Sequence, residues 1–481
     1  MKKRKTAKEI KRIHFMGISG SGCSGAAYLA RYEGFQVSGC DLNPNTSSTD
    51  QLRKLKIPIH GGHNISHLRK ADLLVTSPAV LIVNSRHPEI REAKRRGIIL
   101  TWQQFIGRYL QKDKYLVCIA GTHGKTTTSA LVGQILEAGK LDPTVLVGGV
   151  VPVWQANVRC GESNYFICEA DEYYNNFLNY SPKMAVITNI EMDHPEFFSN
   201  LDQLRKSFTR FIFRLDQPKI LIVNSDDDNI RQILVKNQLR LNRERVQITA
   251  FHLDSAFDFP FAKDFRGIIN RQEKFSTRFS IVFDHGKKTI KEDFQLRIPG
   301  RHNVYNALAA YACGWFLNIN SETLKTVFNS FSGVKRRFEI VGKEARRIVI
   351  DDYGHHPTQI AATIEAVKQR YPKSFIWAVL EPHQTRFRFF TNEFVTALKK
   401  ANQVIVTEIF WGREKITSGL SAQELAAKIG LPKASCIEDF KKVADFIAKN
   451  SRSEDVVIVF GAGNSSQLAK MIVRQLKKLA K

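Results

Sequence analysis

Residues 121–128 read Gly-Thr-His-Gly-Lys-Thr-Thr-Thr, and this stretch decides the fold. The apolar run 115–120 before it predicts a buried strand, and residues 129–136 after it have the apolar spacing of a helix. A strand, a glycine-rich turn, a Lys-Thr pair and a helix are together the layout of a phosphate-binding loop. The loop is a shortened variant, because Ile119 stands where the common form has its first glycine.

The residue types in this loop predict a nucleotide site. Glycines let backbone N–H groups close around phosphate oxygens, and the N-terminus of the following helix adds a partial positive charge. Lys125 is placed to reach the outer phosphates, and the Thr126 hydroxyl is placed to bind Mg²⁺. The alternative is a glycine turn with a chance Lys-Thr pair, which the flanking strand and helix disfavour.

Acidic groups follow two apolar strands downstream of the loop. Residues 165–168 run into Glu-Ala-Asp-Glu at 169–172, and residues 184–190 run into Glu-Met-Asp-His at 191–194. Both strand ends fall at the edge of a parallel sheet where the loop also lies. Carboxylates beside phosphates repel unless a cation lies between them, so we expect Mg²⁺ there rather than a solvated acidic surface.

The first hundred residues predict a second nucleotide-binding unit. A strand at 12–16 leads into a Gly-x-Gly-x-x-Gly turn at 20–25, a helix at 26–32 and a strand that ends at Asp41, and a later strand ends near Ser77. In such a unit the turn holds a pyrophosphate and the carboxylate holds a ribose hydroxyl. The alternatives are a tight turn without a ligand and an ordinary surface aspartate.

Length and composition predict a globular protein of about three domains. The chain has 481 residues, 43% of them hydrophobic. No apolar run approaches the ~18 residues that span a bilayer, and the apolar segment after the basic residues 1–12 is too short for a signal peptide. The seven cysteines are scattered without a Cys-x-x-Cys pair and suggest neither a zinc site nor a redox motif. We therefore expect a cytoplasmic protein.

The formal net charge of +26 raises the question of a nucleic-acid partner. Lysine and arginine are spread along the whole chain, however, and aromatic-studded basic patches are not evident. We do not expect nucleic acid to be the partner. We expect small-molecule substrates, bound by a monomer or a weak homodimer.

The fold class predicted from these patterns is α/β with three domains. They are a Rossmann-like domain at 1–112, a central P-loop ATPase domain at 113–332 with a parallel sheet and a smaller β-rich part, and a second Rossmann-like domain at 333–481. Asn303 and Asn306 fall on one face of a predicted helix, where their amides are placed to meet a base; the alternative is a polar helix start.

Seven motifs occur together and in one order. They read Gly-Thr-His-Gly-Lys-Thr-Thr, Glu-Ala-Asp-Glu, Thr-Asn-Ile-Glu-x-Asp-His, Gly-Arg-His-Asn, Arg-Arg-Phe-Glu, Asp-Asp-Tyr-Gly-His-His-Pro-Thr and Pro-His. From Ile13 to the C-terminal Gly-Ala-Gly, the chain resembles the Mur ligase family. The resemblance implies ATP- and Mg²⁺-dependent joining of an amino acid to the carboxylate of a UDP-sugar. It is strongest to the branch that adds L-alanine to UDP-N-acetylmuramate in peptidoglycan biosynthesis.

The resemblance also implies the residues of each site. ATP would be bound by Gly121, Thr122, His123, Gly124, Lys125, Thr126, Thr127, Asn303, Asn306, Arg337 and Asp351. The UDP-sugar would be bound by Gly17, Ser19, Gly20, Ser21, Gly22, Asp41 and Ser77. The amino acid would be bound by Tyr353, His355 and Arg386, and the metal by Thr126, Glu169 and His194. The implied catalytic residues are Lys125, His194, Arg337 and His355.

Two departures from the pattern leave the amino acid open. Tyr173-Tyr174 follows Glu-Ala-Asp-Glu, where the alanine-adding branch usually continues Ser-Asp and where the related murein tripeptide-recycling ligase also has a tyrosine. Gln384 stands where that branch has its first arginine, although Arg386 matches the second. The runner-up is therefore a tripeptide-recycling ligase. More distant alternatives are a nucleic-acid-associated P-loop NTPase and a nucleotide-binding scaffold.

Overall fold

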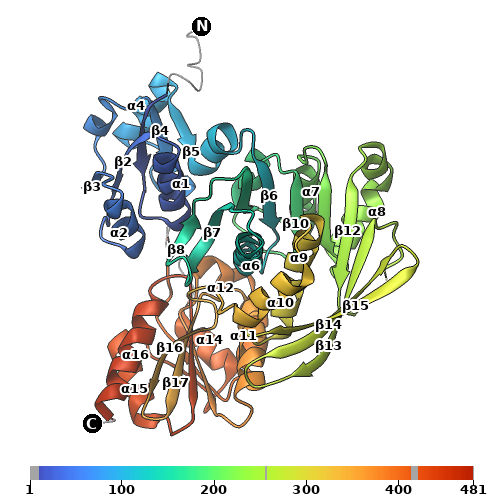
Figure 1. Ribbon diagram of the computed structural model, residues 1–481. Coiled ribbons are helices and arrows are strands. Elements are labelled where there is room, and N and C mark those ends of the chain that lie inside the picture. The colour runs from blue at the N-terminus through green and yellow to red at the C-terminus, as the bar shows by residue number, and fades with distance from the viewer. Residues whose placement is uncertain (1–9, 255–256, 413–420, 480–481) are drawn as a thin grey trace.

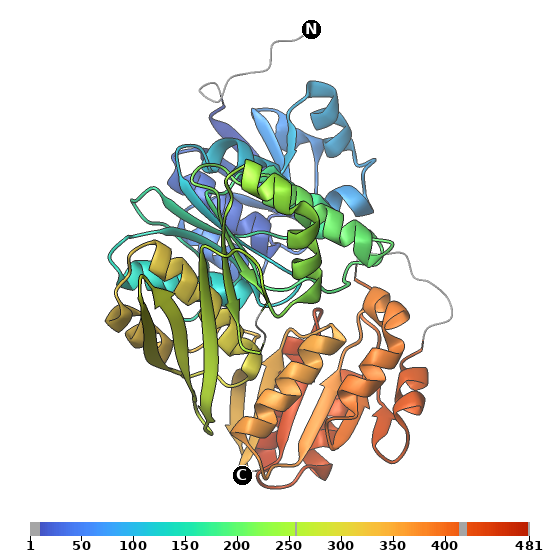
Figure 2. The same cartoon turned by 90° about the vertical axis from the view of Figure 1, so that its right-hand side faces the viewer.

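The computed structural model describes residues 10–254, 257–412 and 421–479, which form three sheets in chain order (Figure 1). The first sheet lies at the top of the view, the central sheet crosses the middle, and the third lies below. Turned by 90°, the molecule shows the same three layers from top to bottom (Figure 2). Helices flank all three sheets, which confirms the predicted α/β class.

The first sheet is parallel, with the order β3-β2-β1-β4-β5. Its strands are β1 (Arg12–Met16), β2 (Gln36–Asp41), β3 (Ile59–Gly61), β4 (Leu73–Thr76) and β5 (Ile99–Thr101). Its helices are α1 (Ser21–Tyr32), α2 (Ser47–Lys54), η2 (Ile65–Leu68), α3 (Pro78–Val83), α4 (Pro88–Arg96), α5 (Trp102–Phe105) and η3 (Ile106–Leu110). The strand order reverses at β1, so the ligand crevice of such a sheet lies where the glycine turn begins.

Helix α1 begins earlier than the sequence predicts, at Ser21 rather than near Ala26. A Cβ on Gly22 would lie 2.4 Å from the Trp102 ring, and one on Gly25 would lie 2.3 Å from Leu146. The glycines let the helix approach both neighbours closely. This packing outweighs the low helix propensity that makes the sequence look like a loop.

The central sheet has ten strands in the order β15-β14-β13-β12-β11-β10-β6-β9-β7-β8. They are β6 (Tyr115–Ala120), β7 (Thr144–Val151), β8 (Ala156–Arg159), β9 (Tyr165–Glu169), β10 (Met184–Ile187), β11 (Ile220–Asn224), β12 (Gln247–His252), β13 (Lys263–Gln272), β14 (Thr277–His285) and β15 (Lys288–Leu296). The helices are α6 (Lys125–Ala138), η4 (Tyr173–Asn179), α7 (Leu201–Ile212), α8 (Asp228–Arg243), α9 (Arg301–Phe316) and α10 (Ser321–Ser330). The parallel strands are almost wholly apolar because helices cover both of their faces, whereas the antiparallel β13–β15 form the predicted β-rich part.

The third sheet has the order β16-β17-β21-β18-β19-β20. Its strands are β16 (Glu339–Glu344), β17 (Arg347–Asp352), β18 (Ile376–Leu380), β19 (Gln403–Val406), β20 (Ala434–Cys436) and β21 (Val456–Phe460). Its helices are α11 (Pro357–Arg370), α12 (Gln384–Phe389), α13 (Thr391–Leu398), α14 (Ala422–Ile429), α15 (Phe440–Asn450) and α16 (Ser465–Leu479). Separate apolar clusters fill its two faces, one under α11, α13 and α14 and the other under α15 and α16.

One apolar core joins the first and central sheets. It runs from β1 and α1 through β6 and β9 to α7 without a break. The two sheets are therefore held in a fixed relation by burial rather than by a linker. In the described parts of the chain, no helix has the length and apolar character needed to cross a bilayer.

We expect Phe211→Ala on α7 to destabilise this core. The Phe211 ring is fully buried and stacks on Phe177 with centroids 4.6 Å apart. Truncation removes the ring and leaves a cavity, at a cost of about 3–5 kcal/mol in the free energy of unfolding. Urea unfolding followed by tryptophan fluorescence measures it. Leu239→Ala, at an 89% exposed position on α8, is the control, and equal effects of the two variants would contradict the core assignment.

Candidate functional site

The glycine loop between β6 and α6 has a conformation that requires its glycines. Gly121 and Gly124 have φ angles of +131° and +84°, which residues with a Cβ rarely adopt. A Cβ on Gly124 would also lie 2.4 Å from Asn306 Oδ1, on helix α9. The loop thus presents the free N–H groups of the first turn of α6 as a site for anions.

The Lys125 ammonium lies beneath this loop and is held by oxygen atoms. Its Nζ donates to the carbonyl of Gly121 at 2.6 Å and to the carboxylate of Glu172 at 2.8 Å. The Glu172 side chain is itself buried. Although burial lowers the pKa of Lys125, the carboxylates of Glu172 and Asp171 outweigh it and raise that pKa, so the ammonium is charged.

Thr126 and Glu169 place two oxygen donors side by side. Thr126 Oγ1 donates to Glu169 Oε1 at 3.1 Å, and Glu169 Oε2 accepts the backbone N–H of Gly148 at 2.7 Å. Hydroxyl and carboxylate oxygens are the ligands that Mg²⁺ prefers. The structure therefore brings together two of the three predicted metal ligands.

The third predicted ligand, His194, has a different set of partners. Its ring stacks on Tyr173 with centroids 4.1 Å apart, and it forms a group of potential ligand atoms with Asp171 and Glu172. Arg386 donates to His194 Nδ1 at 2.9 Å. Glu196 Oε1 lies 3.3 Å from the same nitrogen, and a Glu172 carboxylate oxygen lies 4.0 Å from Nε2. Side chains therefore engage both ring nitrogens of His194, and a metal would have to displace one of these contacts.

A cavity of about 590 Å³ lies beside the loop, between the central and third domains. This is the size of a small-molecule site. The predicted ATP residues in its wall are His123, Gly124, Thr126, Thr127, Asn303, Asn306 and Arg337. Gly121, Thr122 and Lys125 lie outside the wall, at the base of the loop.

The two asparagines predicted to meet a base are buried and bonded to their surroundings. Asn303 Nδ2 donates to the carbonyl of Pro299 at 2.6 Å, and Asn306 Nδ2 donates to Asn303 Oδ1 at 3.1 Å. Asn306 Oδ1 accepts the Thr128 hydroxyl at 3.2 Å. These amides brace α9 against the phosphate loop as well as facing the cavity.

Strand β17 ends in two aspartates that face opposite sides of the third sheet. Asp352 lines the cavity, whereas Asp351 lies outside its wall, with its carboxylate 3.5 Å from Arg336. Side chains alternate along a strand, so one of the pair at most faces the cavity. The sequence prediction named Asp351, but the structure places Asp352 there. Asp352 accepts the N–H groups of Phe338 and Gly354 at 2.8 and 2.7 Å and so shapes the wall.

The start of α11 in the third domain touches the acidic strand end of the central domain. Gln359 Nε2 lies 2.9 Å from His123 Nδ1, and the Thr358 hydroxyl donates to Glu191 at 2.6 Å. His123 Nε2 in turn lies 2.8 Å from Glu191. The third domain therefore closes one side of the phosphate loop.

Helix α12 brings Arg386 to the same strand end. Arg386 Nε donates to Asp193 Oδ1 at 3.0 Å, and both side chains are buried. Burial alone would raise the pKa of Asp193, but His194 and Arg386 outweigh it and hold that pKa well below its usual range. The sequence predicts Arg386 as a ligand of the amino acid; in the structure its guanidinium bonds Asp193 and His194.

Tyr353 and His355 lie on the loop between β17 and α11. The guanidinium carbons of Arg336 and Arg337 lie 4.9 and 5.1 Å from the centroid of the Tyr353 ring, within cation–π range. His355 Nδ1 lies 2.9 Å from the carbonyl of Tyr353, which fixes Nδ1 as the donor and leaves the lone pair on Nε2. Burial, with Arg386, holds the pKa of His355 well below its usual range, so the ring is neutral.

The residues predicted for the UDP-sugar gather at one end of the first sheet. Gly17, Gly20 and Gly22 form or flank the turn into α1, and Ser77 N–H bonds the carbonyl of Met16 at 3.1 Å. Asp41 accepts the backbone N–H of Ser19 at 3.0 Å, so its carboxylate helps to hold the turn.

A chain of hydrogen bonds joins this turn to the phosphate loop. Ser21 Oγ donates to the carbonyl of Gly148 at 2.9 Å, and the N–H of Gly148 donates to Glu169, which accepts the Thr126 hydroxyl. The first-domain turn and the central loop are thus adjacent parts of one site.

Three Mur ligase sequence models match the chain in order. The family's catalytic domain matches residues 12–113, the middle domain matches 119–314 and the glutamate ligase domain matches 336–463. The UDP-N-acetylmuramate–L-alanine ligase of Acetivibrio thermocellus is 35% identical over 477 residues, 98% of this chain and 97% of that protein. The chain belongs to the Mur ligase family.

Other members of the Mur ligase family are also similar to this chain over nearly its whole length. The UDP-N-acetylmuramate–L-alanine ligase of Geotalea uraniireducens is 36% identical, over 98% of this chain and 99% of its own. The crystal structure of UDP-N-acetylmuramate–alanine ligase from Thermotoga maritima has a TM-score of 0.79 at 25% identity, covering 98% of this chain and all of that one. The murein peptide ligase of Psychrobacter arcticus, at 23% identity and a TM-score of 0.71, covers 97% and 99% and shares the fold.

The sequence prediction gave no individual role to several residues at this Mur ligase site. They are Glu172 under Lys125, Asp352 in the cavity wall, and Glu191, Thr358 and Gln359 where the third domain meets the loop. Most stand inside or next to the quoted motifs. The signal was present, but sequence alone does not tell which member of a motif faces the ligand.

We expect Arg386→Met to destabilise the protein by about 3–5 kcal/mol, because it leaves Asp193 buried without its counter-ion. Urea unfolding gives the free energy. Arg388→Met, at an exposed position on the same helix, is the matched control and should change it by less than about 0.5 kcal/mol. Adding Asp193→Asn to Arg386→Met should restore part of the loss. A single variant as stable as the control would show that the pair contributes nothing.

Proposed function

We propose that this Mur ligase joins L-alanine to the carboxylate of UDP-N-acetylmuramate with hydrolysis of ATP to ADP and phosphate. The observation that carries the proposal is the similarity, over 98% of the chain, to proteins named UDP-N-acetylmuramate–L-alanine ligase. The adjacency of the first-domain turn and the phosphate loop supports it, because a UDP-sugar on one and ATP on the other would meet at Gly148.

The reaction needs activation, because a carboxylate oxygen leaves poorly. Transfer of the terminal phosphoryl group of ATP makes an acyl phosphate, which leaves well. Both partners are anionic, so the step needs positive charge and alignment. Lys125 from below the loop and Arg337 from the third domain are the residues we assign to that charge.

Thr126 and Glu169 would hold Mg²⁺, and His194 would join them after reorganisation of its contact with Arg386. The donors fit the ion, since the pair already places a hydroxyl and a carboxylate oxygen 3.1 Å apart. Bound there, Mg²⁺ would neutralise charge on the phosphates.

The second step needs the amine of alanine as a free base. His355 is the base that the geometry favours, because its ring is neutral and Nε2 keeps its lone pair. We assign Tyr353, on the loop that carries His355, and Arg386, on α12 near His355, to the surroundings of the amino acid. Closure of the third domain over the loop would keep water from the acyl phosphate.

The remaining assignments are part of the same proposal. The domains are 1–112 for the UDP-sugar, 113–332 for ATP and 333–481 for the amino acid. Gly17, Ser19, Gly20, Ser21, Gly22, Asp41 and Ser77 would bind the UDP-sugar, and Asp352 replaces Asp351 at the nucleotide. We place the enzyme in the cytoplasm, where ATP is available, as a monomer or weak homodimer.

A second candidate is ligation of a recycled murein tripeptide to the same UDP-sugar. The observation that favours it is Tyr173, which stacks on His194 at the acidic strand end. His194 also contacts Arg386 on α12, the helix that begins at Gln384. The two candidates share the activation step and differ only in the acceptor amine.

The deciding experiment is phosphate release from ATP with UDP-N-acetylmuramate and, in separate assays, each of a panel of amino acids or the free murein tripeptide. Release that requires L-alanine supports the proposal, and release only with the tripeptide supports the second candidate. Release that requires a different amino acid would show that this amino acid, and not L-alanine, is the substrate. Release stimulated by nucleic acid instead, or no release at all, would overturn both ligase proposals.

We expect Lys125→Ala to lower kcat by at least about a hundredfold, because the developing phosphoryl charge loses its buried cation. Phosphate release measures kcat, and thermal unfolding checks that the variant is folded. Lys206→Ala, whose ammonium is 69% exposed on α7, is the matched control and should leave kcat unchanged. Near-normal turnover in Lys125→Ala would remove Lys125 from the phosphate site.

We expect Glu169→Gln to raise the Mg²⁺ concentration needed for half-maximal activity by about tenfold or more, because a carboxylate ligand is lost. Titration of Mg²⁺ at fixed ATP measures it. Glu244→Gln on the far end of α8 is the control. His194→Ala decides the third ligand: an unchanged Mg²⁺ requirement places His194 outside the metal site.

A further inference from the structure

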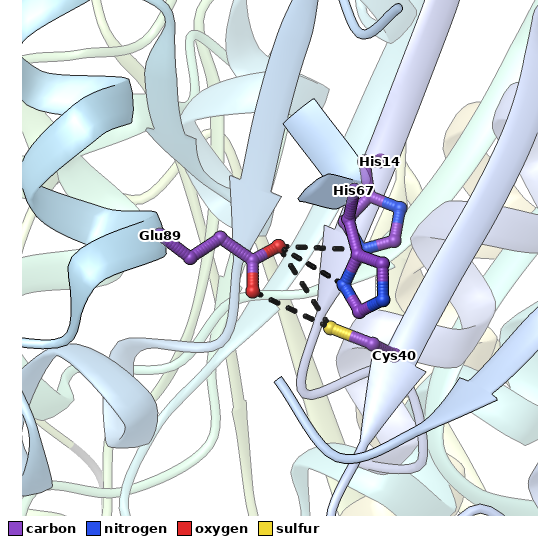
Figure 3. A group of neighbouring side chains, drawn as sticks. All are labelled: His14, Cys40, His67 and Glu89. Atoms are coloured by element: carbon purple, nitrogen blue, oxygen red, sulfur yellow. Dashed lines mark hydrogen bonds and ion pairs between the residues drawn. The ribbon is translucent and has the colours of Figure 1, made fainter. Parts of the chain in front are cut away.

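Four side chains of the first domain point toward one another (Figure 3). They are His14 on β1, Cys40 on β2, His67 on η2 and Glu89 on α4. We propose that they bind a structural zinc ion. The proposal does not depend on which substrates the enzyme takes.

The spacing of the ligand atoms suits a tetrahedral metal. Glu89 Oε1 lies 3.4 Å from His14 Nε2, 3.6 Å from His67 Nδ1 and 3.9 Å from Cys40 Sγ. In a tetrahedral zinc site the ligand atoms lie about 3.3–3.6 Å apart, from the usual bond lengths. All four atoms already lie within 4.8 Å of one another, so no pair needs to approach by more than about 1.2–1.5 Å to reach tetrahedral spacing.

The burial of these groups calls for a cation. His14, Cys40 and Glu89 are 1%, 0% and 0% exposed. His14 Nε2 and His67 Nδ1 make no hydrogen bond within the described part of the chain. Nor does any described lysine or arginine pair with Glu89. A buried carboxylate ringed by ring nitrogens and a thiol is costly without a positive charge among them.

The donor set selects the metal. Two imidazoles, one thiol and one carboxylate are the ligand types of zinc. Mg²⁺ and Ca²⁺ prefer oxygen ligands only, which excludes them from a site with sulfur and nitrogen. With four protein ligands the site has no open position, as in structural rather than catalytic zinc sites. Binding would release the Cys40 thiol proton to solvent.

Further histidines surround the cluster and orient its ligands. His63 Nδ1 lies 3.1 Å from Cys40 Sγ, and the His60 ring stacks on His67 with centroids 4.9 Å apart. Partners of this kind fix the orientation of metal ligands. His63 is also the nearest substitute ligand if one of the four does not bind.

The position of the cluster explains what zinc would do. The apolar core on this side of the sheet is small, with Met16, Leu68, Leu74 and Ile90 among its members. A metal there would tie β1 and β2 to η2 and α4, replacing packing that a small core lacks. Cys40 precedes Asp41, which holds the substrate turn through Ser19, so the metal would also stiffen that turn.

The test uses the full chain stripped of metal by a chelator and then given Zn²⁺ or Co²⁺ without nucleotide. We expect one zinc per chain by elemental analysis and, with Co²⁺, a thiolate-to-metal charge-transfer band. Zinc should raise the first thermal transition by about 5 °C or more at saturation. The other candidate clusters of the described chain contain only histidine and carboxylates, so the thiolate band reports on this one.

Cys40→Ser should abolish the Co²⁺–thiolate band and lower zinc content at least tenfold, whereas Cys160→Ser, a half-buried cysteine outside the cluster, should leave both unchanged. Glu89→Gln keeps the shape of the side chain and should weaken zinc binding at least tenfold. If Cys40→Ser fails to fold, the wild-type band and thermal shift still decide. A wild-type chain that binds no zinc, or a band that survives Cys40→Ser, overturns the proposal.

Discussion

The site depends on one electrostatic constraint, the crowding of carboxylates at the edge of the central sheet where phosphates would bind. Glu169 ends β9, Glu172 follows it, and Glu191 and Asp193 follow β10. Each carboxylate has a positively charged or hydrogen-bonding partner. Lys125 donates to Glu172, the N–H of Gly148 to Glu169, Thr358 to Glu191 and Arg386 to Asp193. The edge is therefore built to balance negative charge, and it binds phosphates only where further cations are supplied.

The third domain is part of this balance. Its residues reach the same edge, Arg386 to Asp193 and Thr358 to Glu191, while Arg337 enters the cavity wall. These contacts are polar, unlike the apolar core that joins the first two sheets. A small polar interface is easier to open than a buried core. The first two sheets thus share one apolar core, whereas the third domain meets the central domain through polar and charged contacts.

The fold was largely predictable because its strands are apolar runs and its loops carry glycine motifs, such as the turn before α6. For the site, the sequence could predict which motifs take part but not which side chain of each motif faces the cavity. The sequence named Asp351 where Asp352 lines the cavity, since a one-residue difference reverses the facing of a strand side chain. It could not show that Arg386 is buried against Asp193, because that contact depends on tertiary packing. Local spacing also missed the His14–Cys40–Glu89 cluster, whose members come from distant elements.

The same limit of sequence motifs explains why they leave the identity of the incoming amino acid open. The motifs indicate phosphoryl transfer, the step that both candidate reactions share. The charged residues that serve this step must lie in the same places whichever amine is joined. In the proposed mechanism, specificity for the incoming amine would depend on the surroundings of His355. They include the His383 ring, with centroids 6.3 Å apart, which precedes the buried Gln384 in the chain. A buried amide can satisfy several hydrogen-bonding arrangements, whereas an arginine at that position would demand an anion. If the proposed assignment holds, glutamine in place of arginine would change the charge offered to the amino acid and would leave the residues of the activation step in place. The reaction type and the acceptor would then be separable properties of this chain.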